Sequence, residues 1–145
     1  LAEAACALFP RANKDLLLVG IFLHDIGKLD ELSQDLFVDY TTEGKLLGHI
    51  HLGAHLAETH IAAIPDFPPD LRQHLLHLIL SHHGEVELGS PVTPKTIEAI
   101  LLHHIDNLDA QASAFERIIE ETQSNRRVWS DYQPLIQREI YARDA

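Results

Sequence analysis

The sequence predicts an all-α fold formed by a single helical domain. Apolar residues recur at helical spacing along most of the 145 residues, and no segment shows the alternation that marks a half-buried strand. Glycine and proline clusters separate the helical stretches, and 46% of the residues are hydrophobic. A chain of this length and composition can bury a core of its own.

The first two predicted helices are separated by a proline. Residues 1–9 have the composition of a helix end, and Pro10 follows where a helix cannot continue. Asn13 is a favourable N-cap residue, so the next helix is expected over residues 14–24. Residues 28–40 lack helical spacing and are expected to form a loop with at most a short turn.

Three longer helices are predicted beyond this loop. Thr41-Thr42-Glu43 opens a helix that is expected to reach residue 64, and the next one spans residues 69–83 and ends before Gly84. A helix from residue 93 to residue 112 or beyond follows a glycine- and proline-bearing loop. A short segment around residues 134–141 closes the chain.

Charge and composition restrict the possible partners. The net charge of −11 disfavours direct binding of a nucleic-acid backbone by this segment, although bound divalent cations would offset several charges. No run of apolar residues is long enough for a membrane span, and a single cysteine fits a reducing, cytoplasmic setting. The chain opens on Leu1 and has no methionine, so it is expected to be part of a longer protein.

The segment FLHDIGK places a histidine and an aspartate at the end of the apolar run LLLVGIFL. A buried carboxylate costs several kcal/mol unless it is paired. The pair His24-Asp25 therefore either lies at a solvated helix end or holds a metal. The chain contains eleven histidines, which offer further candidate ligands, because neutral imidazole is the commonest metal ligand.

The helix after residue 41 offers one such ligand. His49 and His60 flank its apolar stripe, whereas His55 points away from the stripe. Since eleven residues span about 16 Å of helix, the two flanking histidines cannot share one metal. His49 is the better candidate because the neighbouring Gly48 permits close approach, although taken alone it could be a half-buried structural histidine.

The two following helices offer three more candidate ligands. His82-His83 ends an apolar helix, where the pair could ligate a metal or merely complement the helix dipole. Asp106 lies within a helix that is apolar nearly all round, and neither Lys nor Arg occurs between residues 95 and 117. Metal ligation is therefore favoured for Asp106 over a salt bridge or a helix cap.

Together these residues form a ligand set of nitrogen and oxygen donors without a thiolate. Such a set suits Mn, Fe, Mg or Zn, and the mixture of imidazole and carboxylate fits Mn or Fe well. Metal sites of this kind activate water and stabilise phosphoryl oxygens, with one or two ions. Lys28 could bind a substrate phosphate as a point charge, or it could be an ordinary surface lysine.

The motifs resemble those of a known superfamily, the HD-domain metal-dependent phosphohydrolases. HDIGK is common across that superfamily. Longer phrases resemble the HD domain of the YhaM-type 3′–5′ exoribonucleases: YTTEGKLLGHIHLG at 40–53, LSHHGEVELGSPVTP at 80–94, AILLHHIDNLDA at 99–110 and WSDYQPLIQREIYA at 129–142.

The resemblance implies an all-α HD fold and a hydrolase, typically Mn-dependent, that trims RNA or single-stranded DNA from the 3′ end to nucleoside 5′-monophosphates. Asp25 would bridge the metals, and Lys28 would bind the scissile phosphate. The metal ligands implied by position are His24, Asp25, His49, His82, His83 and Asp106. In the wider superfamily a further histidine precedes the HD pair, and here we expect it upstream of Leu1. The family's OB-fold module, which would bind single strands, is not in this chain; either it lies upstream, or the protein lacks it and acts on small nucleotides.

Two alternatives remain open at this stage. The same fold could hydrolyse mononucleotides or another small phosphate ester. It could also serve as a non-catalytic binding or signalling module, which predicts little bound metal. The sequence does not define the oligomeric state.

Overall fold

The structure is a computed structural model that describes residues 1–33 and 37–143. Within this part of the chain every named element is a helix, which confirms the all-α prediction. In chain order they are α1 (Ala2–Leu8), α2 (Lys14–Leu23), α3 (Lys28–Glu31), α4 (Thr42–Ala62), α5 (Pro69–Ser81), the 3-10 helix η1 (Val86–Leu88) and α6 (Ile97–Ser124). None of the helices in the two described ranges is long and apolar enough to cross a membrane.

The chain divides into two compact units, Leu1–Ile105 and Asp106–Ala145. The boundary falls within α6, so each unit contains part of this helix. The first unit contains the remaining helices and five of the six predicted metal ligands, all except Asp106.

The start of α2 agrees with the predicted cap. The Asn13 side chain accepts a hydrogen bond from the backbone N–H of Leu16 at 3.1 Å, which satisfies one of the unpaired donors of the first turn. The backbone N–H of Asn13 in turn donates to the Glu98 carboxylate at 2.7 Å. This second bond fastens the start of α2 to the first turn of α6.

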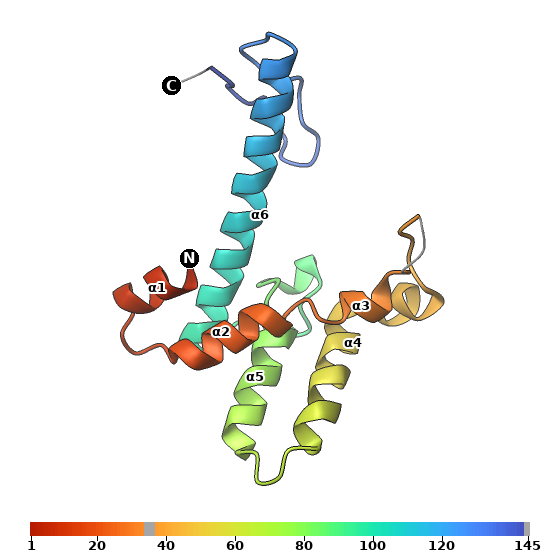
Figure 1. Cartoon of the computed structure of the whole chain (residues 1–145), viewed down its shortest axis with the longest axis vertical. Coiled ribbons are helices and arrows are strands. Elements are labelled where there is room, and N and C mark those ends of the chain that lie inside the picture. Colours follow the sequence, from red (N-terminus) through yellow and green to blue (C-terminus); the bar gives the residue numbers. More distant parts are fainter. Residues whose placement is uncertain (34–36, 144–145) are drawn as a thin grey trace. The chain divides into compact units, whose positions relative to one another are not determined.

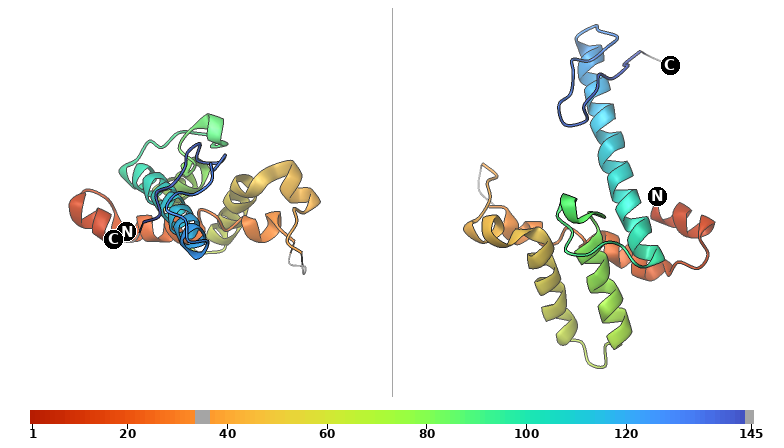
Figure 2. Two further views of the ribbon diagram at one scale, coloured as in Figure 1. Left: turned by 90° about the horizontal axis from the view of Figure 1, so that it is seen from above. Right: turned by 180° about the vertical axis from the view of Figure 1, so that it is seen from behind.

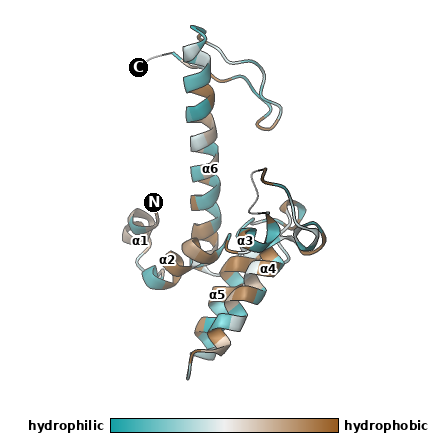
Figure 3. Ribbon diagram, turned by 45° about the vertical axis from the view of Figure 1, so that its right-hand side comes forward, coloured by the Kyte–Doolittle hydropathy of each residue, from teal (hydrophilic) through white to brown (hydrophobic). Residues whose placement is uncertain are grey.

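Helices α4 and α5 lie side by side and run in opposite directions, joined by a short turn (Figures 1 and 2). Figure 3 shows hydrophobic residues along both helices. Helix α2 packs on α5, where Gly20 leaves room for the fully buried side chain of Leu78. The buried residues of this core are Ala2, Leu16, Leu17, Ile61, Leu75, Leu78 and Leu102.

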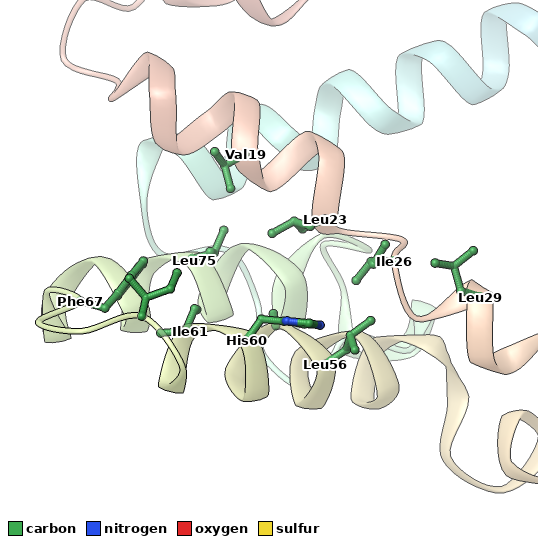
Figure 4. A pocket seen from close by; sticks show the side chains of 11 residues that line it. Val19, Leu23, Ile26, Leu29, Leu56, His60, Ile61, Phe67 and Leu75 are labelled. Carbon is green, nitrogen blue, oxygen red and sulfur yellow. The ribbon is translucent and has the colours of Figure 1, made fainter.

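An apolar pocket of about 510 Å³ lies between α2, α4 and α5. In Figure 4, side chains of α2 such as Val19 and Leu23 point toward Ile61 and Leu75 of the facing helices. His60 is the one residue with an ionisable side chain in this lining. The pocket is thus an apolar hollow whose lining includes the exposed residues Val19, Leu29 and Ile64, and it lacks the polar groups of a reaction site.

Two element boundaries differ from the sequence prediction. Helix α6 begins at Ile97 instead of residue 93, because the side chain of Thr96 accepts the backbone N–H of Ala99 at 3.2 Å and so caps the helix. The helix then continues to Ser124. The segment at 134–141 belongs to an irregular antiparallel hairpin, in which Trp129 is bridged to Tyr141.

Candidate metal centre

The end of α2 delivers the histidine–aspartate pair. His24 is the C-cap residue of α2, and its Nδ1 lies 2.8 Å from the carbonyl oxygen of Ile21. Because a carbonyl only accepts hydrogen bonds, this contact places the ring proton on Nδ1. Nε2 then faces the Asp25 carboxylate, 3.3 Å from Oδ2.

A kink in α4 positions His49. Gly48 has φ 72° and ψ 154°, which lies outside the helical region and is a conformation accessible mainly to glycine. The predicted uninterrupted helix is therefore wrong at this point, and His49 begins a second helical segment. His49 Nε2 lies 3.5 Å from Asp25 Oδ1.

The end of α5 supplies the next two histidines. His82 is the C-cap residue and only 1% exposed; its Nδ1 contacts the carbonyl oxygen of Ile79 at 2.7 Å, and its Nε2 lies 3.8 Å from Asp25 Oδ1. His83 Nδ1 contacts the carbonyl oxygen of Leu88 at 2.9 Å. Both rings are thus held through Nδ1, which leaves Nε2 free for a ligand.

The turn after His83 is held by a residue of α6. Gly84 has φ +84°, and a Cβ at this position would overlap the imidazole of His103. His103 Nδ1 in turn lies 2.9 Å from the carbonyl oxygen of His82. The two contacts fix the backbone that carries His82 and His83.

The four rings form one cluster, and Nε2 of His24, His49 and His82 lies within 4 Å of an Asp25 oxygen. Ring centroids lie 4.4 Å apart for His82 and His83, 5.0 Å for His24 and His82, and 5.2 Å for His49 and His83. One ligand atom from each of His49, His82 and His83 can be chosen so that all three lie within 4.8 Å of one another. Such spacing suits a single cation bound between them.

Three polar atoms at the centre of this cluster are buried and lack a hydrogen-bond partner among the described residues. They are Asp25 Oδ1, His49 Nε2 and His82 Nε2. An unsatisfied buried polar group costs about 1–3 kcal/mol, so three that converge require an explanation. Each can donate a lone pair, and a divalent cation would accept all three. The residues present therefore fit a divalent metal.

The protonation states favour the same ligand set. Burial alone would raise the pKa of Asp25, but the neighbouring His24 ring and the Lys28 ammonium group outweigh it and hold the pKa well below its ordinary range. Burial lowers the pKa of His82 to about 4. At neutral pH the carboxylate is therefore charged and the His82 imidazole is neutral, as metal ligation requires.

The structure brings together five of the six predicted ligands: His24, Asp25, His49, His82 and His83. Lys28 lies at the start of α3, with Nζ 2.6 Å from Asp25 Oδ2. Asp106 is the first residue of the second unit and a half-buried residue of α6. The other two histidines considered on α4 lie elsewhere: His60 lines the apolar pocket, and His55 is exposed.

One residue at this site was not predicted. The Glu31 carboxylate accepts two contacts from His49, to the backbone nitrogen at 3.0 Å and to Nδ1 at 3.2 Å. Glu31 lies in the stretch predicted as a loop, and nothing in its neighbouring sequence indicates a partner eighteen residues away.

The helical fold and the clustered histidine–aspartate pair define a class of protein. The family model described as "HD domain" matches residues 1–111, and the chain belongs to this family. The resemblance inferred from the motifs is thereby confirmed. No solved structure gives a significant match.

Particular relatives carry a more specific name, 3′-5′ exoribonuclease YhaM. The protein of that name from Bacillus subtilis is 44% identical over 122 residues, which cover 83% of this chain and 38% of the relative. The one from Bacillus licheniformis is 46% identical over 123 residues, with the same coverage, and that from Geobacillus sp. is 42% identical over 133 residues. The matched region thus spans a little over a third of each relative.

Proposed function

We propose that this chain is the catalytic domain of a metal-dependent 3′–5′ exoribonuclease that hydrolyses the terminal phosphodiester of single-stranded RNA and releases nucleoside 5′-monophosphates. The names of the relatives support the reaction and the substrate. The observation that carries the proposal is the convergence of Asp25 Oδ1, His49 Nε2 and His82 Nε2, buried and without hydrogen-bond partners in the described part of the chain.

The proposed ligand set combines geometry and sequence. Asp25, with both oxygens near imidazoles or Lys28, is the candidate bridge between two ions. Asp106 is included on its sequence pattern and its match to the family motif alone. The full set is His24, Asp25, His49, His82, His83 and Asp106. Its mixture of imidazole and carboxylate donors favours Mn²⁺.

When bound, the metal activates water and stabilises charge on the phosphoryl oxygens. The protein's own groups prepare the site for it. The contacts of Asp25 with His24 and Lys28 keep its carboxylate ionised, and the Nδ1 contacts of His24, His82 and His83 with backbone carbonyls fix their rings. Rigid ligands lose little freedom when the cation binds, which raises affinity.

Lys28 is the candidate residue for substrate phosphate. Its side chain is about half exposed, so the ammonium group can reach solvent while it contacts Asp25. An ammonium group at this place attracts the anionic end of an RNA strand and offsets charge that develops on the scissile phosphate. The remainder of this acidic chain offers little general attraction for RNA, which favours recognition of one terminal phosphate over binding along the backbone.

Substrate choice provides the test. The chain is incubated with Mn²⁺ and a 5′-labelled oligoribonucleotide, and in parallel with nucleoside monophosphates and triphosphates. The proposal predicts a ladder of 5′-labelled products that shortens from the 3′ end and disappears with EDTA or in Asp25→Asn. Turnover of mononucleotides with an intact oligonucleotide would establish the small-substrate alternative, and metal-free, inactive protein would establish the binding-module alternative.

A further inference from the structure

Glu31 is a buried carboxylate in α3 that no motif explains. Glu31 is only 8% exposed. Because ionised carboxylates are almost never buried without a partner, its side chain requires one. The segment that carries it packs closely on α4, since a Cβ at Gly44 would overlap the Glu31 carbonyl group. Its side chain is thereby held next to the kink of α4.

The kink creates the first group that Glu31 binds. Because Gly48 leaves the helical conformation, His49 opens a new helical segment whose first N–H groups have no carbonyl in helical register. Glu31 Oε1 accepts the backbone N–H of His49 at 3.0 Å. The Glu31 side chain, although distant in the sequence, thus caps the N-terminus of this helical segment.

The same oxygen also faces the His49 ring. Oε1 lies 3.2 Å from Nδ1, and an ionised carboxylate can only accept a hydrogen bond. The ring proton of neutral His49 is therefore on Nδ1, and the lone pair is on Nε2. Nε2 is the buried atom without a hydrogen-bond partner among the described residues, 3.5 Å from Asp25 Oδ1.

His49 differs in this respect from the other histidines of the cluster. His24, His82 and His83 hold Nδ1 against backbone carbonyl oxygens of their own neighbourhood. The orientation of these three rings is therefore set by the backbone, whereas the orientation of His49 depends on one side chain.

We propose that Glu31 is a positioning residue that fixes the ring orientation and tautomer of His49 and so presents Nε2 to the metal. This inference rests on the proposed metal site. Carboxylates that hold a ligating histidine in this way orient the ring and make it a stronger ligand, and their loss costs about 10–100-fold in metal affinity or activity.

Two measurements on the same variants test this role. The tautomer of His49 is read from the ¹⁵N chemical shifts of its ring nitrogens in the metal-free chain, and Mn²⁺ affinity is measured by calorimetry. In the wild type we expect the proton on Nδ1. Glu31→Ala should move the proton toward Nε2 and weaken Mn²⁺ binding by about 10–100-fold.

Two further variants separate positioning from general effects. Glu31→Gln keeps an oxygen that can accept both hydrogen bonds, so it should retain the Nδ1 tautomer and recover most of the affinity. Asp30→Asn removes a neighbouring exposed carboxylate of α3 and should leave both readouts unchanged. If Glu31→Ala lacks the circular dichroism of the wild type, Glu31→Asp, which keeps the charge but withdraws the oxygens, takes its place with the same expected changes.

An unchanged His49 tautomer together with unchanged Mn²⁺ affinity in Glu31→Ala or Glu31→Asp would overturn the inference. Equal losses of Mn²⁺ affinity in Glu31→Gln and Glu31→Ala would also overturn it, because they would assign the effect to the charge of Glu31 rather than to its hydrogen bonds. The tautomer is measured without metal or RNA. If the Glu31 variants show the expected tautomer shift but the wild-type chain shortens no RNA, the proposed function is contradicted and the inference still holds.

Discussion

Gly27 and His49 are in direct backbone contact. A Cβ at Gly27 would overlap the carbonyl oxygen of His49 and would lie 2.5 Å from the backbone nitrogen of Gly53. The absence of a side chain at Gly27 allows the segment that follows Asp25 to pack closely on α4, next to the kink. The distance of 3.5 Å between Asp25 Oδ1 and His49 Nε2 depends on that approach. Gly27 thus joins two parts of the candidate metal centre.

The variant Gly27→Ala should separate these two parts. The new methyl group meets backbone atoms, which cannot rotate away, so we expect a loss of at least about 1–3 kcal/mol in the free energy of unfolding. Chemical denaturation with and without Mn²⁺ measures this loss. We also expect weaker Mn²⁺ binding by the folded variant. Wild-type stability and affinity would show that the backbone contact is not required.

The variant Lys28→Gln should separate substrate binding from metal binding. In the wild type the Lys28 ammonium group contacts Asp25, and its positive charge repels a cation bound there. Mn²⁺ affinity should therefore be unchanged or higher in the variant. Turnover of an oligoribonucleotide should fall on the order of 100-fold, the scale found when one group that stabilises a transition state is removed. Lys45→Gln removes an exposed lysine 3.8 Å from Asp39 and serves as the matched control. Loss of Mn²⁺ binding in Lys28→Gln would instead indicate a role in organising the ligands.

A histidine outside the cluster should contribute to the pH dependence of stability. His77 Nε2 accepts the backbone N–H of Lys95 at 2.9 Å, and burial, with smaller contributions from the charges of Lys95 and His74, lowers its pKa from the ordinary 6.5. The unfolded chain therefore takes up the proton first. The stability contributed by neutral His77 is complete above about pH 6.5 and is lost as the pH falls toward the lower pKa of the folded state.

Denaturation between about pH 7.5 and pH 5, in the presence of EDTA, tests this contribution. His77→Gln keeps an acceptor for the Lys95 N–H but cannot titrate, so its unfolding free energy should depend less steeply on pH than that of the wild type. His55→Gln removes an exposed histidine and serves as the control. Identical slopes for the wild type and His77→Gln would show that His77 does not contribute.

Much of the site follows from local sequence features. Asn13 and Thr41 are N-cap residues with side chains that accept backbone N–H groups, as their positions before apolar periodic runs predict. The histidine–aspartate pair ends an apolar helix, and His82 ends another. Helix ends that carry ligand-type residues after buried runs can therefore be recognised from the amino-acid sequence alone.

The kink and the contact with Glu31 could not be recognised in the same way. The apolar spacing of α4 continues across Gly48, so periodicity alone indicates an unbroken helix, whereas the actual φ of 72° depends on the packing of the neighbouring α3. Glu31 contacts His49 across eighteen positions only because α3 folds back on α4. Both features arise from tertiary contacts between α3 and α4, and the sequence of neither segment indicates a contact with the other.

Mn²⁺ titration of Asp25→Ala and His55→Ala tests most directly whether the cluster that contains Asp25 holds a divalent cation. Asp25 lies within 4 Å of three of the clustered histidines, whereas His55 is an exposed residue of α4. We expect at least one Mn²⁺ per chain in the wild type and in His55→Ala, and none in Asp25→Ala with its helical content retained. Equal Mn²⁺ binding by Asp25→Ala and the wild type would show that Asp25 is not a metal ligand.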